Sequence, residues 1–252
     1  LELVVKTPTF KQYPYSQKPD FTTNRAIAQQ VAEEGMILLK NNAALPLSAG
    51  KIALLGNASY DTFVGGTGSG EVQSAYTISF YDGLKKAGFS LDENLKKAYL
   101  SYITEEKEKR PKRMSILDVI KPVEEFPISE EQLQQMSRNC EAAIITIGRS
   151  AGEGSDRSLE TDYVLNDKEL ALVKATASAF HAQGKKLIIA LNIDAVVEVT
   201  KWQDLADALL ITWLPGQEAG YAFANIIAGK TNPSGKLPQT MALSYSDIPS
   251  AT

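Results

Sequence analysis

Short apolar segments alternate with amphipathic helical segments along most of this chain, and this alternation restricts the possible folds more than any other feature. The apolar segments have strand length and lie at 36–40, 51–56, 142–147, 187–191 and 208–213. Strands that are apolar on both faces are typical of parallel sheets with helices on both sides. The sequence therefore predicts an α/β fold, a three-layer αβα sandwich around a mainly parallel sheet of five or six strands.

The segments between these strands carry start and stop signals for helices. The predicted helices begin at capping side chains or end at glycines, as helices commonly do. They cover about 23–35, 79–88, 92–110, 129–136, 166–184 and 216–229. Residues 111–128 contain three prolines and are predicted to form a long loop.

The two ends of the chain have the character of linkers. Residues 1–22 contain Pro8, Pro14 and Pro19 without strand or helix periodicity, and residues 246–252 contain no helix that would close the fold. We therefore expect one domain at 23–245 between linkers at 1–22 and 246–252. The chain begins without Met and without a signal-peptide pattern, so we expect it to belong to a longer polypeptide.

Composition restricts the partners and the chemistry. The formal net charge of −4 argues against nucleic acid or an anionic membrane as the main partner, because both require a basic surface. No apolar stretch approaches the ~20 residues that span a bilayer. Cys140 is the only cysteine, which excludes an internal disulfide and a cysteine-based metal cluster. We expect neither a metal nor another cofactor.

The strongest candidate for a chemical role is Glu153, which lies between two glycines in the segment Gly148-Arg-Ser-Ala-Gly-Glu-Gly-Ser-Asp-Arg157. Flanking glycines let a backbone turn tightly and approach a ligand. Three charged neighbours can shift the pKa of this carboxyl group: Arg149, Asp156 and Arg157. The alternative, which the pattern alone favours, is a solvated turn with an incidental ion pair.

A second candidate is the glycine-rich loop at 64–70, Val64-Gly-Gly-Thr-Gly-Ser-Gly70. It is no dinucleotide fingerprint, because Gln73 stands where the third glycine is required. The loop is either a backbone cradle for a hydroxyl-rich ligand, with Thr67, Gly68 and Ser69 in contact with it, or a flexible connector. Both interpretations remain open at this point.

Other polar and aromatic residues have ordinary structural interpretations. His181, the only histidine, lies late in a helix, where a surface role is expected. Trp213 stands at a strand end and could stack on a sugar, but a core position is favoured for it as for Trp202. Gln217 and Glu218 could bind a ligand, but a capping role at the start of a helix is favoured.

Six segments, taken together and in order, resemble the C-terminal domain of family 3 glycoside hydrolases of the β-glucosidase type. They cover roughly residues 20–245. The segments are Val31-Ala-Glu-Glu-Gly-Met-Ile-Leu-Leu-Lys-Asn41, Ala44-Leu-Pro-Leu47, Val64-Gly-Gly-Thr-Gly-Ser-Gly70, Gly152-Glu-Gly-Ser-Asp-Arg157, Leu214-Pro-Gly-Gln-Glu218 and Asn232-Pro-Ser-Gly-Lys-Leu-Pro238.

This resemblance implies a six-stranded αβα sandwich that packs on a (β/α)8 barrel of the same polypeptide. In the family the barrel supplies an aspartate nucleophile, and the sandwich domain supplies a glutamate acid/base, to which Glu153 corresponds. The loop at 65–70 would reach toward the sugar pocket. The implied activity is hydrolysis of terminal β-linked glucosyl residues, and the implied substrate is a β-glucoside or oligosaccharide.

Two rival classes remain: a non-catalytic α/β module that binds a sugar or mediates assembly, and a nucleotide-binding regulator, which Gln73 disfavours. The compartment is open. A single cysteine fits the cytoplasm and also a bacterial periplasmic or secreted location, and the latter is slightly favoured.

Overall fold

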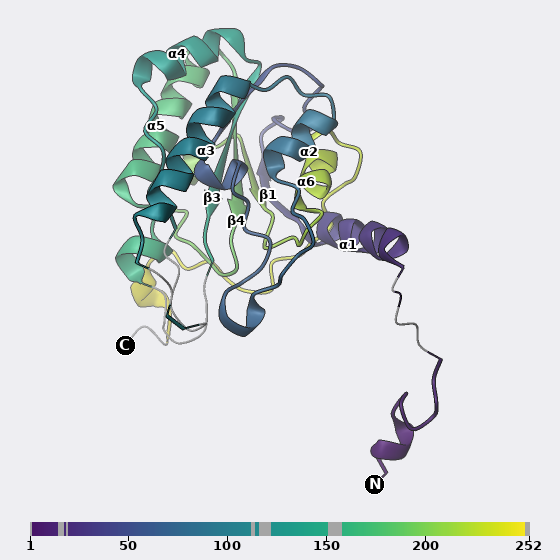
Figure 1. Cartoon of the computed structure of the whole chain (residues 1–252). Coiled ribbons are helices and arrows are strands. Elements are labelled where there is room, and N and C mark those ends of the chain that lie inside the picture. The colour runs from purple at the N-terminus through teal and green to yellow at the C-terminus, as the bar shows by residue number, and fades with distance from the viewer. Residues whose placement is uncertain are drawn as a thin grey trace.

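The structure, a computed structural model, describes residues 2–14, 18, 20–111, 114–115, 122–150 and 158–249. It confirms the predicted α/β sandwich, with helices on both sides of a mainly parallel sheet (Figure 1). The helices are α1 Phe21–Gly35, α2 Phe80–Lys86, α3 Glu93–Glu108, α4 Glu130–Asn139, α5 Asp167–His181 and α6 Ala219–Ile227. The strands are β1 Ile37–Asn41, β2 Ile52–Leu55, β3 Ala142–Gly148, β4 Lys186–Asn192 and β5 Ala208–Ile211.

The sheet has the order β1-β5-β4-β3-β2, and the strands β2, β3, β4 and β5 run parallel. Their carboxyl ends consequently lie at one edge of the sheet, where α/β folds usually bind ligands. Strand β1 pairs antiparallel with β5 and closes that side. The described residues thus form five strands, at the lower end of the five or six that the sequence predicts.

Two groups of helices cover the sheet. Helices α4 and α5 pack against each other, and α5 lies on β3 and β4. Helices α2 and α6 form the other group, with α1 against α6 (Figure 1). The contact between α2 and α6 requires glycine, because a Cβ atom on Gly83 would lie 1.8 Å from the carbonyl oxygen of Gly220.

A buried carboxylate connects α1 to α6 and to the segment that follows α6. Glu33 is 7% exposed and accepts hydrogen bonds from the Asn225 and Thr231 side chains, each at 2.7 Å, and from Gln29 at 2.8 Å. A buried carboxylate needs such donors to offset the loss of hydration. These contacts give Glu33 a structural role, whereas the next residue, Glu34, is exposed.

The helix termini follow the predicted signals closely. The capping boxes Ser129–Gln132 and Asn166–Glu169 are both present, and Asp92 accepts from two backbone N–H groups of α3. Helix α1 begins at Phe21, inside the segment that we predicted as a linker, because Asp20 caps it.

The apolar side chains with helical spacing in α1 do not face the core of the domain. Ile27 and Val31, placed four residues apart, are 53% and 65% exposed, and the helix instead turns Ala32 and Glu33 inward. The buried Glu33 explains this, because its donors on α6 and beyond fix the rotation of the helix.

Candidate functional site

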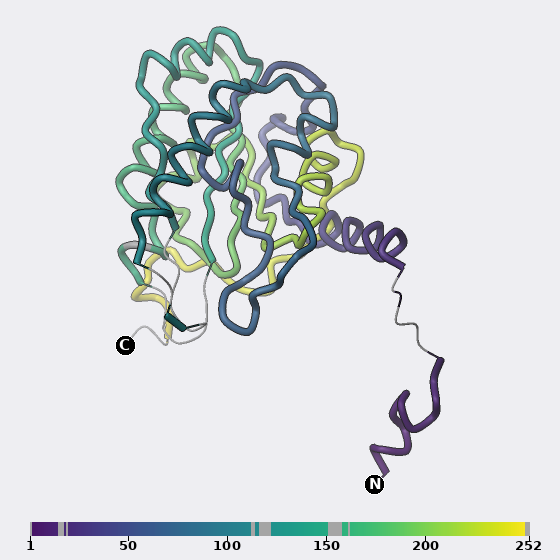
Figure 2. Tube along the Cα trace, viewed as in Figure 1, coloured from purple at the N-terminus to yellow at the C-terminus, as the bar shows by residue number. Residues whose placement is uncertain are grey.

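Two long connections leave the carboxyl edge of the sheet, one after β2 and one after β3, as the sequence suggested. The first contains the glycine-rich loop (residues 64–70) and extends beyond the strand ends as the blue segment in Figure 2. The second, which we call the glutamate loop (residues 149–163), follows the neighbouring strand. Because β2 and β3 are adjacent and parallel, both loops start at the same edge.

Within the glutamate loop, Glu153, Asp156 and Arg157 fall in 151–157, outside the described residues. What the structure describes is the two ends of this loop and the residues that hold them. The loop returns through a single π-helical turn, Leu159–Tyr163, which leads into α5. The roles predicted for these three residues therefore stay predictions.

Arg149 holds the two ends of the glutamate loop together. Its guanidinium is fully buried and makes two parallel hydrogen bonds, of 2.6 and 2.7 Å, to the Glu169 carboxylate at the start of α5. Its Nε–H donates to the carbonyl of Asp162 at 2.8 Å, and another N–H donates to the carbonyl of Gly148 at 2.8 Å. Bidentate geometry of this kind fixes direction as well as distance. Arg149 thus connects the start of the glutamate loop to its return at Asp162 and to the start of α5.

Asn192, the last residue of β4, forms hydrogen bonds to the segments that follow β2, β3 and β5. Its Oδ1 accepts from the backbone N–H of Phe63 at 2.7 Å, while its Nδ2 donates to the carbonyls of Phe63 and Trp213 at 2.8 and 2.7 Å. Its own carbonyl accepts from the backbone N–H of Arg149 at 2.9 Å. Asn192 is completely buried, so no water replaces these contacts.

The residues that immediately precede the two loops, Gly148 and Phe63, also contact each other directly. Gly148 ends β3, and a Cβ atom there would lie 2.6 Å from the Phe63 ring and 2.8 Å from Ala58. Any larger residue would push the start of the glycine-rich loop away from the glutamate loop. The pair Gly148 and Phe63 therefore brings the two candidate loops together, which the sequence alone did not indicate.

In the glycine-rich loop, the three predicted contact residues lie at or near the surface. Thr67 and Gly68 are half-buried, and Ser69 is exposed in the short 3-10 turn Gly68–Gly70. Gly68 has a φ of +67°, a conformation that side chains with a Cβ atom rarely adopt. The loop thus presents backbone and hydroxyl groups from a turn that depends on glycine.

A buried carboxyl group that the sequence analysis missed lies below both loops. Both oxygens of Glu125 accept from the backbone N–H of Asn57, at 3.0 and 3.2 Å, and Oε1 also accepts from Phe126 at 3.0 Å. Burial, with a smaller contribution from the nearby Glu169, raises the pKa of Glu125 to about 8, although the backbone donors and Arg149 act in the opposite direction. The group is thus mostly protonated near pH 7. A proline-rich stretch gives no sequence signal for such a residue.

The remaining sequence candidates have structural roles. His181 is on the surface, as predicted, 2.9 Å from Asp207. Trp202 is a core residue, as predicted, whereas Trp213 is half-buried with a φ of +55°. The capping role predicted for Glu218 is wrong: its side chain makes no cap hydrogen bond and turns instead to Tyr76.

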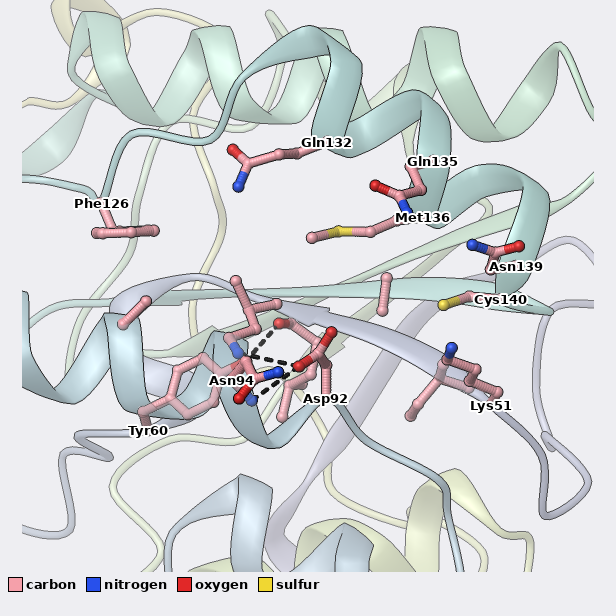
Figure 3. A pocket seen from close by; sticks show the side chains of 15 residues that line it. Lys51, Tyr60, Asp92, Asn94, Phe126, Gln132, Gln135, Met136, Asn139 and Cys140 are labelled. Carbon is pink, nitrogen blue, oxygen red and sulfur yellow. Dashed lines mark hydrogen bonds between the residues drawn. The ribbon is translucent and has the colours of Figure 1, made fainter.

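Another hollow on the described residues lies away from both loops. A cavity of about 320 Å³ begins at the amino-terminal ends of β2 and β3 and is lined by Lys51, Asp92, Met136 and Cys140, among others (Figure 3). The Asp92 carboxylate in it caps α3, at 2.8 and 3.0 Å from two N–H groups. This cavity offers no paired acids, so we assign it no catalytic role.

Among the described residues, no group of acidic, histidine or cysteine side chains is arranged to hold a metal, and no helix is long and apolar enough to cross a membrane.

Comparisons with known proteins place this geometry in a family. Residues 36–252 match the glycosyl hydrolase family 3 C-terminal domain, and the chain therefore belongs to this family. The predicted resemblance is confirmed.

Several of the similar proteins are β-glucosidases. A β-glucosidase from Ruminococcus albus is 32% identical over 227 residues, which cover 88% of this chain and 23% of that protein. A periplasmic β-glucosidase from Salmonella typhimurium is 28% identical over 249 residues, 94% of this chain and 31% of that protein. β-Glucosidase 3B from Thermotoga neapolitana, solved with glucose, has a TM-score of 0.90 and 42% identity, with 99% of this chain and 35% of that chain covered. The chain thus spans about a quarter to a third of the length of these relatives.

The Asn192 contacts predict that its amide cannot be replaced by a carboxylate. In Asn192→Asp, an acceptor would face the carbonyls of Phe63 and Trp213 in a buried position, and we expect a loss of about 3 kcal/mol in the free energy of unfolding. Chemical denaturation measures this value. The matched control is Asn42→Asp on the exposed surface, which should change stability by less than about 0.5 kcal/mol. Equal small losses in both variants would contradict the role of Asn192.

The raised pKa of Glu125 predicts a pH-dependent stability. The folded state retains the Glu125 proton up to about pH 8, whereas the unfolded state releases it near the ordinary value of 4.5. The folded state binds more protons in this window, so the Glu125 contribution is fully present below pH 4.5 and is lost as the pH rises to 8. The loss is at most roughly 1.4 kcal/mol per pH unit.

In Glu125→Gln this contribution should disappear from the curve of unfolding free energy against pH. The neighbouring variant Glu124→Gln serves as control, because Glu124 is exposed and pairs with Lys168 on the surface. If both variants retain the slope of the original protein between pH 5 and 8, Glu125 is not the group responsible.

Proposed function

We propose that this chain is the second, acid/base-carrying domain of a retaining β-glycosidase of the β-glucosidase type. It would hydrolyse terminal β-linked glucosyl residues together with a (β/α)8 barrel of the same polypeptide. The observation that carries the proposal is the contact of Gly148 with Phe63, which joins the roots of the glutamate loop and the glycine-rich loop. The similarity to β-glucosidases over almost the whole chain supports the substrate class.

The chemistry requires two carboxyl groups on opposite sides of the bond that breaks. In a retaining glycosidase, one carboxylate attacks the anomeric carbon, and a second carboxyl group about 5–5.5 Å away protonates the departing oxygen. The second group then removes a proton from water, which releases the sugar from the enzyme. We assign this second role to Glu153 and the nucleophile to an aspartate of the barrel.

The described residues suit such a division of labour. Arg149 and Asn192 fix the described ends of the glutamate loop in the body of the domain. Thr67, Gly68 and Ser69 would contact sugar hydroxyls through side-chain and backbone donors. Asp156 and Arg157 would shift the pKa of Glu153 through their charges.

The proposal also covers the extent and the location of the domain. We place the domain at 23–245 as the sequence predicts, with its start extended to Phe21, where α1 begins. We favour a periplasmic or secreted bacterial location. The support for this location is a periplasmic β-glucosidase among the relatives. A non-catalytic sugar-binding or assembly module is the alternative, and the next two experiments distinguish it from the enzyme domain.

The purified 252-residue chain should fold but should not hydrolyse aryl β-glucosides, because it lacks the nucleophile and acid/base assistance alone gives only about 10²–10⁴-fold. Release of the aryl leaving group measures activity, and a cooperative thermal transition verifies folding. The longer protein that contains this chain is the positive control. Turnover by the purified chain at the rate of the longer protein would refute the division into two half-sites.

In the longer protein, Glu153→Gln should slow glucosides with poor leaving groups by about 10²–10⁴-fold, and much less those with activated leaving groups, which need little protonation. Added azide should restore part of the turnover and yield a glycosyl azide, because azide needs no base. The control is Glu160→Gln, an exposed glutamate in the same loop. Equal losses on all substrates without any azide product would exclude Glu153 as the acid/base.

A further inference from the structure

The turn that precedes α6 and the first residues of this helix, together residues 214–220, contact both ends of the connection that carries the glycine-rich loop. On the outgoing side, the backbone N–H of Gly216 donates to the carbonyl of Val64 at 3.0 Å. On the returning side, Ile78 N–H donates to the carbonyl of Gln217 at 3.0 Å, and Gly220 N–H donates to the carbonyl of Ile78 at 2.9 Å. One short turn therefore holds the loop at its start and at its return.

Side chains add to the hold on the returning segment. The Tyr76 hydroxyl donates to the Glu218 carboxylate and accepts from the Gln217 side chain at 3.0 Å. Glu218 is only 4% exposed, and Gln217 also donates to it at 3.3 Å. A hydrogen bond from a phenol to a buried carboxylate is about twice as strong as one between neutral groups. Tyr76 lies only six residues after Gly70, so this bond restricts the path of the loop.

The surroundings of this contact are tightly fitted. Gly220 allows the start of α6 to approach the returning segment, because a Cβ atom there would lie 2.0 Å from the carbonyl oxygen of Ser79. Gly216 has a φ of +74°, which the turn requires to direct its N–H toward Val64. On α1, a hydrogen bond with Tyr76 and the charge of Glu218 raise the pKa of Arg25. Glu218 therefore lies among Tyr76, Gln217 and Arg25. A side chain that only caps a helix would not require these neighbours.

We infer that Glu218 and Tyr76 are positioning residues for the glycine-rich loop, which hold its returning segment so that Thr67 and Ser69 face the sugar. This inference rests on the proposed function, because it assumes that the loop contacts substrate. It assigns a purpose to the Leu214-Pro-Gly-Gln-Glu218 segment, which the sequence interpretation treated as a helix start. The residues act through the loop and do not themselves touch the reacting atoms.

The test uses hydrogen exchange of residues 64–78 and steady-state kinetics of the longer protein. Glu218→Gln and Tyr76→Phe each weaken the charge-assisted bond, and we expect exchange in 64–78 to increase about tenfold, the scale of one such bond. KM for the glucoside should rise while kcat changes less, because the loop binds the sugar and takes no part in proton transfer. Tyr76→Phe removes one hydroxyl from a half-buried ring and serves as the second variant if Glu218→Gln fails to fold.

The matched control is Glu33→Gln, which replaces another buried carboxylate that contacts α6. Its partners Asn225 and Thr231 lie away from the glycine-rich loop, so exchange in 64–78 and KM should stay unchanged even if overall stability falls. An effect of Glu33→Gln equal to that of Glu218→Gln on both readouts would overturn the inference, since any loss of stability would then suffice.

A third variant, Ser69→Ala, separates this inference from the proposed function. If Ser69→Ala lowers kcat/KM but Glu218→Gln leaves exchange in 64–78 unchanged, the loop binds sugar and the positioning role is refuted. If exchange rises in Glu218→Gln but neither variant changes kcat/KM, the loop does not bind sugar and the proposed contact itself fails. Supporting data would be increased exchange together with effects on kcat/KM that are not additive in the double variant.

Discussion

The geometry at the carboxyl edge of the sheet depends on the buried carboxamide of Asn192. One side chain satisfies the N–H and the carbonyl of Phe63 and the carbonyl of Trp213, and the backbone of the same residue accepts from Arg149. No other uncharged side chain supplies an acceptor and two donor hydrogens in one plane except glutamine, which is longer. The three segments that leave the sheet at this edge thus share one reference point, and their relative positions follow from it.

The segments around Asn192 are held at their bases by buried contacts, and parts of them are exposed to solvent. Arg149 with Glu169, Gly148 with Phe63, and Glu218 with Tyr76 each hold a loop at its base, whereas Ser69 lies exposed at a tip. An active site built from two domains requires this combination, because the catalytic groups must reach across a boundary and still arrive in a defined geometry. The buried carboxylates of Glu33, Glu169 and Glu218 each accept hydrogen bonds, which limits what their burial costs.

The fold could largely be predicted from the sequence, because apolar strands such as β3 and capping side chains such as Asn166 are local signals. The rotation of α1 could not, since Glu33 meets donors nearly 200 residues later in the chain. At the site, the glycine patterns indicated where the loops are. The residues that fix them, Asn192, Glu125 and Tyr76, are single polar groups whose partners are brought together only by folding. A lone amide directly after an apolar strand is the one signal that could have indicated Asn192.

The central claim, that this chain contributes the acid/base of a site whose nucleophile lies elsewhere in the polypeptide, can be tested most directly by trapping the nucleophile. A glucoside with fluorine at C2 and a good leaving group slows release of the covalent intermediate, and mass spectrometry of peptides from the longer protein then locates the attached sugar. We predict that the sugar is attached to an aspartate outside residues 1–252. Attachment to any residue within this chain would contradict the account.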